Sequence, residues 1–233
     1  MFEANSMYRY LKSIWPSPSP ADYARLHGFP PARTARLLVI VEGRHDIEFL
    51  YRINTILHDD DRSIPDLCAL QQCGQLLFIP AGGGDFRPWL SQLSTLGCAE
   101  FHLYDREVPP VSVQRESWAE TINARSGCRA YLTRFRALEN YLHPAAIRDA
   151  RGLSICFGDF DDVASVAAQA SYLAGDPDTC WDHLTARGRR RLRDRAKLWL
   201  NTVAVECMTI DRLADRDPQE DVRAWFRTIE NLL

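Results

Sequence analysis

Short apolar runs alternate with amphipathic stretches over the first two thirds of the chain. The segments 37–41, 76–79 and 101–104 are runs of four or five mostly apolar residues, and turn or polar residues follow each of them. Runs of this length are typical of strands buried in a parallel sheet. A fourth segment, 129–135, alternates arginine with tyrosine, threonine and phenylalanine, which predicts a half-exposed strand.

Apolar residues at helical spacing lie between these runs, at 47–57, 86–96 and 118–124. Alternation of strands and helices with short connections predicts an α/β fold with a mostly parallel four-stranded sheet flanked by helices. Beyond Pro144 the chain favours helices only. These are expected at 144–150, 161–174, 181–208 and 219–231.

Three parts follow from this pattern. Residues 1–35 form an N-terminal arm that contains five of the thirteen prolines, 36–143 form the α/β domain, and 144–233 form a C-terminal helical extension. Proline fixes φ and lacks an amide donor, so we expect the arm to be extended.

Composition excludes several classes of protein. With 233 residues, 46% hydrophobic and 25% charged, the chain is neither disordered nor collagen-like. It lacks a run of about 18 apolar residues and an apolar signal core near residue 1, so we expect a cytoplasmic protein without a membrane partner. Its seven cysteines include no CxxC pair, which argues for reduced thiols and against a zinc ribbon.

An acidic residue follows every predicted strand, and the carboxyl ends of parallel strands meet at one edge of a sheet. A lone carboxylate beside an apolar run is costly unless it is paired or bound to metal. Oxygen ligands suit Mg²⁺ or Mn²⁺, and two such ions can act together on a phosphodiester. Singly, each acid has a simpler explanation as a helix cap or a charge in a first helical turn. The candidates are Glu42, Asp46, Asp85, Asp105, Glu107 and Glu139.

Four motifs together resemble a TOPRIM domain. They are VEGRHD at 41–46, AGGGD at 81–85, YDRE at 104–107 and RALENYL at 136–142. The ENYL segment, with a lysine in the helical tail, resembles the OLD-family nuclease branch. The resemblance implies that Glu42 is a metal ligand or a general acid/base and that Lys197 is catalytic. It also implies metal ligands at Asp46, Asp105, Glu107 and Glu139.

Two features depart from that pattern. The second acid of YDRE is Glu107, one methylene longer than aspartate. The chain also contains no GxxxxGK[ST] phosphate loop, so any ATPase partner would be a separate protein.

Basic residues mark a candidate nucleic-acid surface, although the net charge of −3 excludes a basic coat over the whole protein. Residues 187–197 hold seven positive charges, which form either a solvated helix or a phosphate-binding ridge. Three glycines could let phosphate approach bare backbone. The candidate contacts are Gly82, Gly83, Gly84, Arg134, Arg136, Arg190 and Arg193.

The sequence therefore predicts a Mg²⁺- or Mn²⁺-dependent nuclease, with two ions, that hydrolyses DNA or RNA. The resemblance makes phage or plasmid defence a reasonable setting, and it leaves a homo-oligomer open. The alternative is a non-catalytic TOPRIM-like module that binds nucleic acid or regulates a partner.

Overall fold

The structure is a computed structural model that describes residues 35–82, 93–175 and 180–233. By its internal contacts the chain divides into two units, 1–34 and 35–233. The proline-rich part of the predicted arm and most of the predicted helix at 86–96 lie outside the described residues.

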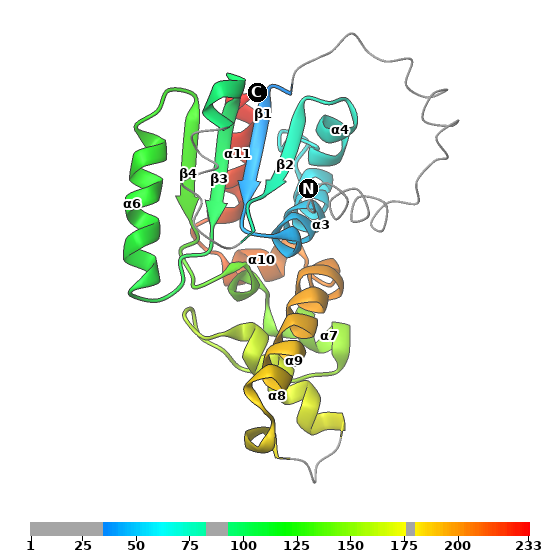
Figure 1. Ribbon diagram of the computed structural model, residues 1–233. Coiled ribbons are helices and arrows are strands. Elements are labelled where there is room, and N and C mark those ends of the chain that lie inside the picture. Colours follow the sequence, from blue (N-terminus) through cyan, green and yellow to red (C-terminus); the bar gives the residue numbers. More distant parts are fainter. Residues whose placement is uncertain (1–34, 83–92, 176–179) are drawn as a thin grey trace, which may run out of the picture. The chain divides into compact units, whose positions relative to one another are not determined.

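Four parallel strands form one sheet in the order β2-β1-β3-β4 (Figure 1). They are β1 (Leu37–Val41), β2 (Leu76–Pro80), β3 (Ala99–Tyr104) and β4 (Cys128–Leu132). All five residues of β1 are buried, as expected for a central strand covered on both faces. The predicted α/β fold with a parallel four-stranded sheet is confirmed.

The fourth strand is shorter than predicted. β4 ends at Leu132, and the next residues turn inward instead of continuing the alternation. The Thr133 hydroxyl accepts a hydrogen bond from the Arg106 amide at 2.8 Å and donates one to the Phe135 carbonyl at 2.8 Å. The prediction of a strand that reaches residue 135 is therefore wrong. Polar and apolar residues alternate over 133–135 as they would in a strand, but here they form a turn.

Helices cover both faces of the sheet. Helices α3 (Arg44–Asp60) and α11 (Asp221–Leu232) share one core with alternate residues of β1 and β3. On the opposite face α6 (Val111–Asn123) packs against β4. Helix α6 begins seven residues before the predicted start, at Val111 instead of Trp118. The short helix α4 (Leu67–Gln72) was not predicted.

Three polar side chains on β3 lie buried on the face toward α6. His102 links Glu100, through Nε2 at 2.8 Å, to the Tyr104 hydroxyl, through Nδ1 at 2.7 Å. Arg125 closes the outer end with two hydrogen bonds to Glu100, at 3.0 and 2.6 Å. Each buried polar group thus has a partner, which offsets the cost of its desolvation.

The C-terminal extension is helical, as predicted. Helices α7 to α10 lie beyond the carboxyl ends of the strands, whereas α11 returns to a face of the sheet (Figure 1). The predicted helix at 181–208 is interrupted twice. Thr185 caps a new helix by accepting a hydrogen bond from the Gly188 amide at 3.1 Å, and a π-helical turn follows Trp199. Further elements lie between β4 and α11 in the chain. They are η2 (Leu138–Tyr141), α7 (Pro144–Arg151), α8 (Val163–Gly175), η3 (Trp181–His183), α9 (Ala186–Trp199), η4 (Leu200–Ala204) and α10 (Ile210–Arg216).

None of the described helices has the length and apolar character needed to cross a membrane.

Candidate active site

The strand order brings Glu42 and Asp105 together. The chain leaves β1 for β2 on one side, while β3 lies on the other, so the carboxyl ends of β1 and β3 flank a topological switch point, where α/β proteins bind ligands. Val41 pairs with Leu103, so the residues after both strands lie at nearly the same level. The Asp105 amide donates a hydrogen bond to Glu42 Oε1 at 2.8 Å.

Arg115 on α6 holds Glu42 from the opposite side. Its Nη2 donates to Glu42 Oε2 at 2.8 Å, and its Nη1 lies 2.5 Å from Glu42 Oε1. The same guanidinium also donates to the Asp105 carbonyl. A planar guanidinium that bridges two strand ends fixes the orientation of the Glu42 carboxylate.

Asp46 enters the cluster from the first turn of α3. It is buried, and its Oδ2 accepts a hydrogen bond from the Gly43 amide at 2.8 Å. A carboxylate at a helix N-terminus is stabilised by the free amides and the helix dipole. The spacing in VEGRHD thus places Asp46 beside Glu42.

Lys197 on α9 lies within ion-pair distance of two of the acids. Its Nζ lies 3.6 Å from Asp105 Oδ2 and 3.5 Å from Glu139 Oε1. Its side chain is 23% exposed, whereas those of Asp105 and Glu139 are only 4% exposed. One ammonium is therefore shared between carboxylates from the end of β3 and from η2.

Further hydrogen bonds fix the carboxylates around Lys197. Asp105 Oδ1 accepts from the Leu138 amide at 3.0 Å, which ties β3 to η2. Asn201 Nδ2 donates to Glu139 Oε1 at 2.6 Å and to the Lys197 carbonyl at 2.8 Å.

Burial and mutual repulsion raise the pKa values of Glu42, Asp46 and Asp105. Desolvation and the charge of Asp105 raise the pKa of Glu42 to about 8, although Arg115 opposes this. The same two causes raise the pKa of Asp46 to about 7, and burial also raises the pKa of Asp105. The charge of Glu139, followed by those of Asp105 and Asp46, raises the pKa of Lys197 despite its burial. The cluster thus has an excess of negative charge that added positive charge would stabilise.

The donor set fits a hard divalent cation. It consists of carboxylate oxygens, and two buried polar atoms nearby, His45 Nδ1 and Asn201 Oδ1, have no hydrogen-bond partner among the described residues. Within residues 35–82, 93–175 and 180–233, no three His, Cys, Asp or Glu side chains converge closely enough to form a metal-binding group. The roles of Glu42, Asp46, Asp105 and Glu139 as ligands therefore stay predictions.

Glu107 pairs with an arginine among the described residues. Its backbone has φ +59°, so it does not continue the extended conformation of the strand. Its carboxylate accepts a hydrogen bond from Arg136 Nε at 3.1 Å. A role for Glu107 as a metal ligand is untested.

The predicted nucleic-acid contacts have different environments. Gly82 has φ +86°, which favours glycine, and its amide donates to the Glu42 carbonyl at 2.9 Å. Gly83, Gly84 and Asp85 lie outside the described residues.

The four predicted arginines also differ in their ion pairs and exposure. Arg134 and Arg136 follow β4 instead of lying on it, and both form ion pairs. Arg193 is bound to Asp162 at 2.9 Å. Arg190 is exposed and forms no ion pair within the described part of the chain. Of these four arginines, Arg190 is therefore the most accessible to a phosphate.

Sequence reasoning missed Arg115 and Asn201. Arg115 lies in an unremarkable polar helix, so only tertiary contact reveals its role. Asn201 did carry a signal, because it is the one polar residue within the run Leu198-Trp199-Leu200-Asn201 and is fully buried. A buried amide within an apolar run needs a partner, which is here an acid.

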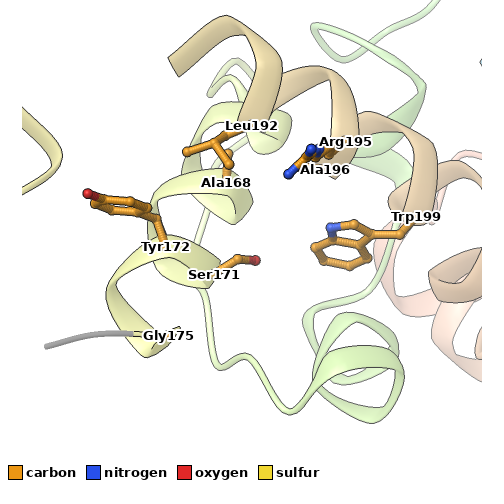
Figure 2. A pocket seen from close by; sticks show the side chains of 8 residues that line it. All are labelled: Ala168, Ser171, Tyr172, Gly175, Leu192, Arg195, Ala196 and Trp199. Carbon is orange, nitrogen blue, oxygen red and sulfur yellow. The ribbon is translucent and has the colours of Figure 1, made fainter. Parts of the chain in front are cut away.

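A pocket of about 520 Å³ lies between α8 and α9 (Figure 2). Tyr172 and Trp199 lie on opposite sides of it, and Leu192, Ala168 and Arg195 also line it. Lys197 does not line this pocket, so it is separate from the acidic cluster.

Comparisons with known proteins give one similarity. No protein-family model and no curated protein matches the chain. Two solved structures of the C-terminal region of the Xanthomonas campestris pv. campestris OLD protein, phased with iodine and with platinum, are similar to it at 14% identity and a TM-score of 0.41. The alignments cover 84% of this chain and 98% and 97% of those chains. The roles of individual residues here rest on the geometry of the acidic cluster alone.

Proposed function

We propose that the protein is a Mg²⁺- or Mn²⁺-dependent nuclease that hydrolyses phosphodiester bonds of DNA or RNA. One observation carries the proposal: three buried carboxylates and one partly buried carboxylate lie at the carboxyl edge of the sheet, and a lysine pairs with two of them. These carboxylates are Glu42, Asp46, Asp105 and Glu139.

Asp46, Asp105 and Glu139 would hold the cation, since each has one oxygen fixed by the protein. When bound, one or two divalent ions polarise a phosphoryl oxygen and lower the pKa of a water molecule. The fixed oxygens accept from the Gly43 amide, the Leu138 amide and the Asn201 side chain. These hydrogen bonds orient each carboxylate singly. The carboxylates would still have to approach one another when the ion binds, because no three of them converge within the described residues.

Lys197 and Glu42 would act on the substrate. The Lys197 ammonium can offset the negative charge that develops on the transferring phosphate. Glu42, held by Arg115 and the Asp105 amide, would donate or accept a proton. Its raised pKa of about 8 keeps part of it protonated near neutral pH in the metal-free protein.

The exposed arginines of α9 would bind the nucleic-acid backbone. Arg187, Arg190 and Arg191 are exposed, and none of the three forms an ion pair within the described residues. Free guanidinium groups on the helix that carries Lys197 would hold phosphates near the acids, without sequence preference.

The test is cleavage of plasmid DNA and of structured RNA by purified protein, with Mg²⁺ or Mn²⁺ and with excess chelator. We expect cleavage with either ion and none in chelator. A separately encoded ATPase remains a proposed partner, and a phage or plasmid defence system remains a proposed setting. Inactivity of the protein alone would therefore call for the assay to be repeated with ATPases encoded beside its gene. Full activity in chelator would refute the metal dependence.

A non-catalytic module that binds nucleic acid or regulates a partner is the second candidate. The observation in its favour is that Lys197 already neutralises part of the cluster, at 3.6 Å from Asp105 and 3.5 Å from Glu139. Calorimetric titration separates the two candidates, because a module of this kind would bind neither Mg²⁺ nor Mn²⁺.

A further inference from the structure

We propose that Asn201 is a positioning residue that keeps Glu139 apart from Lys197 and so available to a divalent cation. The inference rests on the proposed metal site and adds a residue that the sequence motifs do not include.

The helix changes its geometry at this residue. Helix α9 ends at Trp199, and the chain continues through the π-helical turn Leu200–Ala204 before returning to α-helix. A π-helical turn shifts the backbone hydrogen bonds by one residue and is found most often at functional sites. Within this turn the Asn201 side chain donates a hydrogen bond to the Lys197 carbonyl at 2.8 Å. The asparagine is thereby fixed to the backbone of the lysine residue.

The same amide group also holds Glu139. Nδ2 donates to Glu139 Oε1 at 2.6 Å, and Lys197 Nζ lies 3.5 Å from the same oxygen. Among the described residues, Glu139 Oε2 accepts no hydrogen bond. Asn201 thus supplies the short contact to Oε1, which leaves the ammonium at a longer distance and Oε2 without a hydrogen-bond donor.

A neutral donor suits this position better than a charged one. A second cation beside Glu139 would neutralise the carboxylate and compete with a bound metal ion, whereas an amide orients it without adding charge. Asn201 is fully buried, so water cannot replace the amide. Its Oδ1 is buried without a partner among the described residues, and the coordination shell of a nearby cation would satisfy it.

Loss of the amide should therefore let Lys197 close on Glu139. In Asn201→Leu, which keeps the volume and removes both polar atoms, Lys197 would be the main partner of Oε1. A cation would then have to displace a close ion pair. Residues that orient metal ligands typically change metal affinity by about 10–100-fold, and we expect a loss of that size.

Thr202→Val is the matched control. Thr202 lies in the same π-helical turn, and its hydroxyl donates to the carbonyl four residues earlier, at 2.7 Å from Leu198 O, as Asn201 does to Lys197. Its side chain forms no hydrogen bond with an acid among the described residues. A loss of affinity that comes from disturbing the turn would appear in both variants.

The experiment measures Mn²⁺ affinity by electron paramagnetic resonance for the wild type, Asn201→Leu, Asn201→Ala, Thr202→Val, Glu139→Gln and the double variant Asn201→Leu/Glu139→Gln. We expect both Asn201 variants to lose affinity and Thr202→Val to keep it. We also expect the double variant to bind no more weakly than Glu139→Gln alone, because Asn201 acts through Glu139.

Three outcomes would overturn the inference: wild-type affinity in Asn201→Leu, an equal loss in Thr202→Val, or fully additive losses in the double variant. Loss of cooperative unfolding in both Asn201 variants would also overturn it, since the amide would then be a requirement of the fold. Wild-type protein that binds Mn²⁺ but cuts no nucleic acid, either alone or with the ATPases encoded beside its gene, would refute the proposed function and leave this test valid. Wild-type protein that binds no Mn²⁺ would refute both.

Discussion

Replacement of Lys197 tests the shared ammonium most directly. Lys197→Met removes the charge and keeps most of the aliphatic side chain. In the metal-free protein it leaves Asp105 and Glu139, both almost fully buried, without the cation that lies 3.6 and 3.5 Å from them. Removal of one partner from a buried ion pair typically costs about 3–5 kcal/mol, because the other charge remains uncompensated.

The effect on stability should depend on the metal ion. For a chain of this size each kcal/mol corresponds to roughly 2–4 °C, so we expect the metal-free melting temperature to fall by roughly 6–20 °C. Mg²⁺ or Mn²⁺ should restore a larger part of the melting temperature in Lys197→Met than in the wild type, since the ion supplies the missing positive charge. A scan in chelator and a scan with added ion measure both effects.

Lys197→Met should lower the turnover number more than the affinity for substrate. Loss of one preorganised group that stabilises charge lowers kcat on the order of 10²–10³-fold, whereas KM should change little because the exposed arginines of α9 remain. Arg190→Met is the matched control, with the same loss of charge on the same helix at an exposed position. It should change KM and leave kcat near the wild-type value. A Lys197→Met enzyme with wild-type kcat, or one whose defect lies only in KM, would refute a catalytic role and make Lys197 one more phosphate contact.

Three other variants test the rest of the site. The folded-state pKa of Glu42 is raised from 4.5 to about 8, so the metal-free protein should lose stability as pH rises between these values. Glu42→Gln should reduce this dependence of the unfolding free energy on pH, measured by denaturant titration, and the same dependence in the variant as in the wild type would contradict a raised pKa for Glu42. Asp105→Asn should abolish cleavage while the metal-free melting temperature holds or rises, because it removes repulsion and keeps an acceptor for the Leu138 amide; retained cleavage would exclude Asp105. Arg190→Ala should reduce the slope of log affinity against log salt by about one, measured by fluorescence anisotropy with a labelled oligonucleotide, and an unchanged slope would remove Arg190 from the interface.

The sheet could be predicted from sequence because its strands are short and continuously apolar. β1 has the predicted bounds, 37–41, and is buried throughout. Five consecutive apolar residues are the length and composition of a strand covered on both faces. The end of β4 could not be predicted, because it depends on a side chain: the Thr133 amide still donates to the Tyr104 carbonyl, but the next amide, that of Arg106, donates to the Thr133 hydroxyl. Local alternation is the same in a strand and in a turn whose apolar residues point inward.

The convergence of the acids follows from topology, but their individual roles do not. Glu42 and Asp105 come directly after adjacent parallel strands, so the sheet alone brings them together. Glu107 differs because the chain adopts a left-handed conformation two residues after Asp105, which no periodicity reveals. The approach of Lys197 depends on the packing of α9 beyond the strand ends, a contact between residues 92 positions apart that only the fold establishes.

The arrangement of contacts explains how the fold tolerates so many buried acids. Each of Asp46, Asp105 and Glu139 has one oxygen bound to a donor that the fold supplies, from the α3 N-terminus, from η2 and from η4. These hydrogen bonds stabilise each acid singly, but they leave the repulsion between the acids, which contributes to the raised pKa values of Glu42 and Asp46. A fold selected for stability alone would replace such a cluster with apolar residues, because buried charge is weak evidence of stabilisation. Under the proposed function, a divalent cation bound at the switch point of the sheet would offset this repulsion, beside the lysine that is already in place.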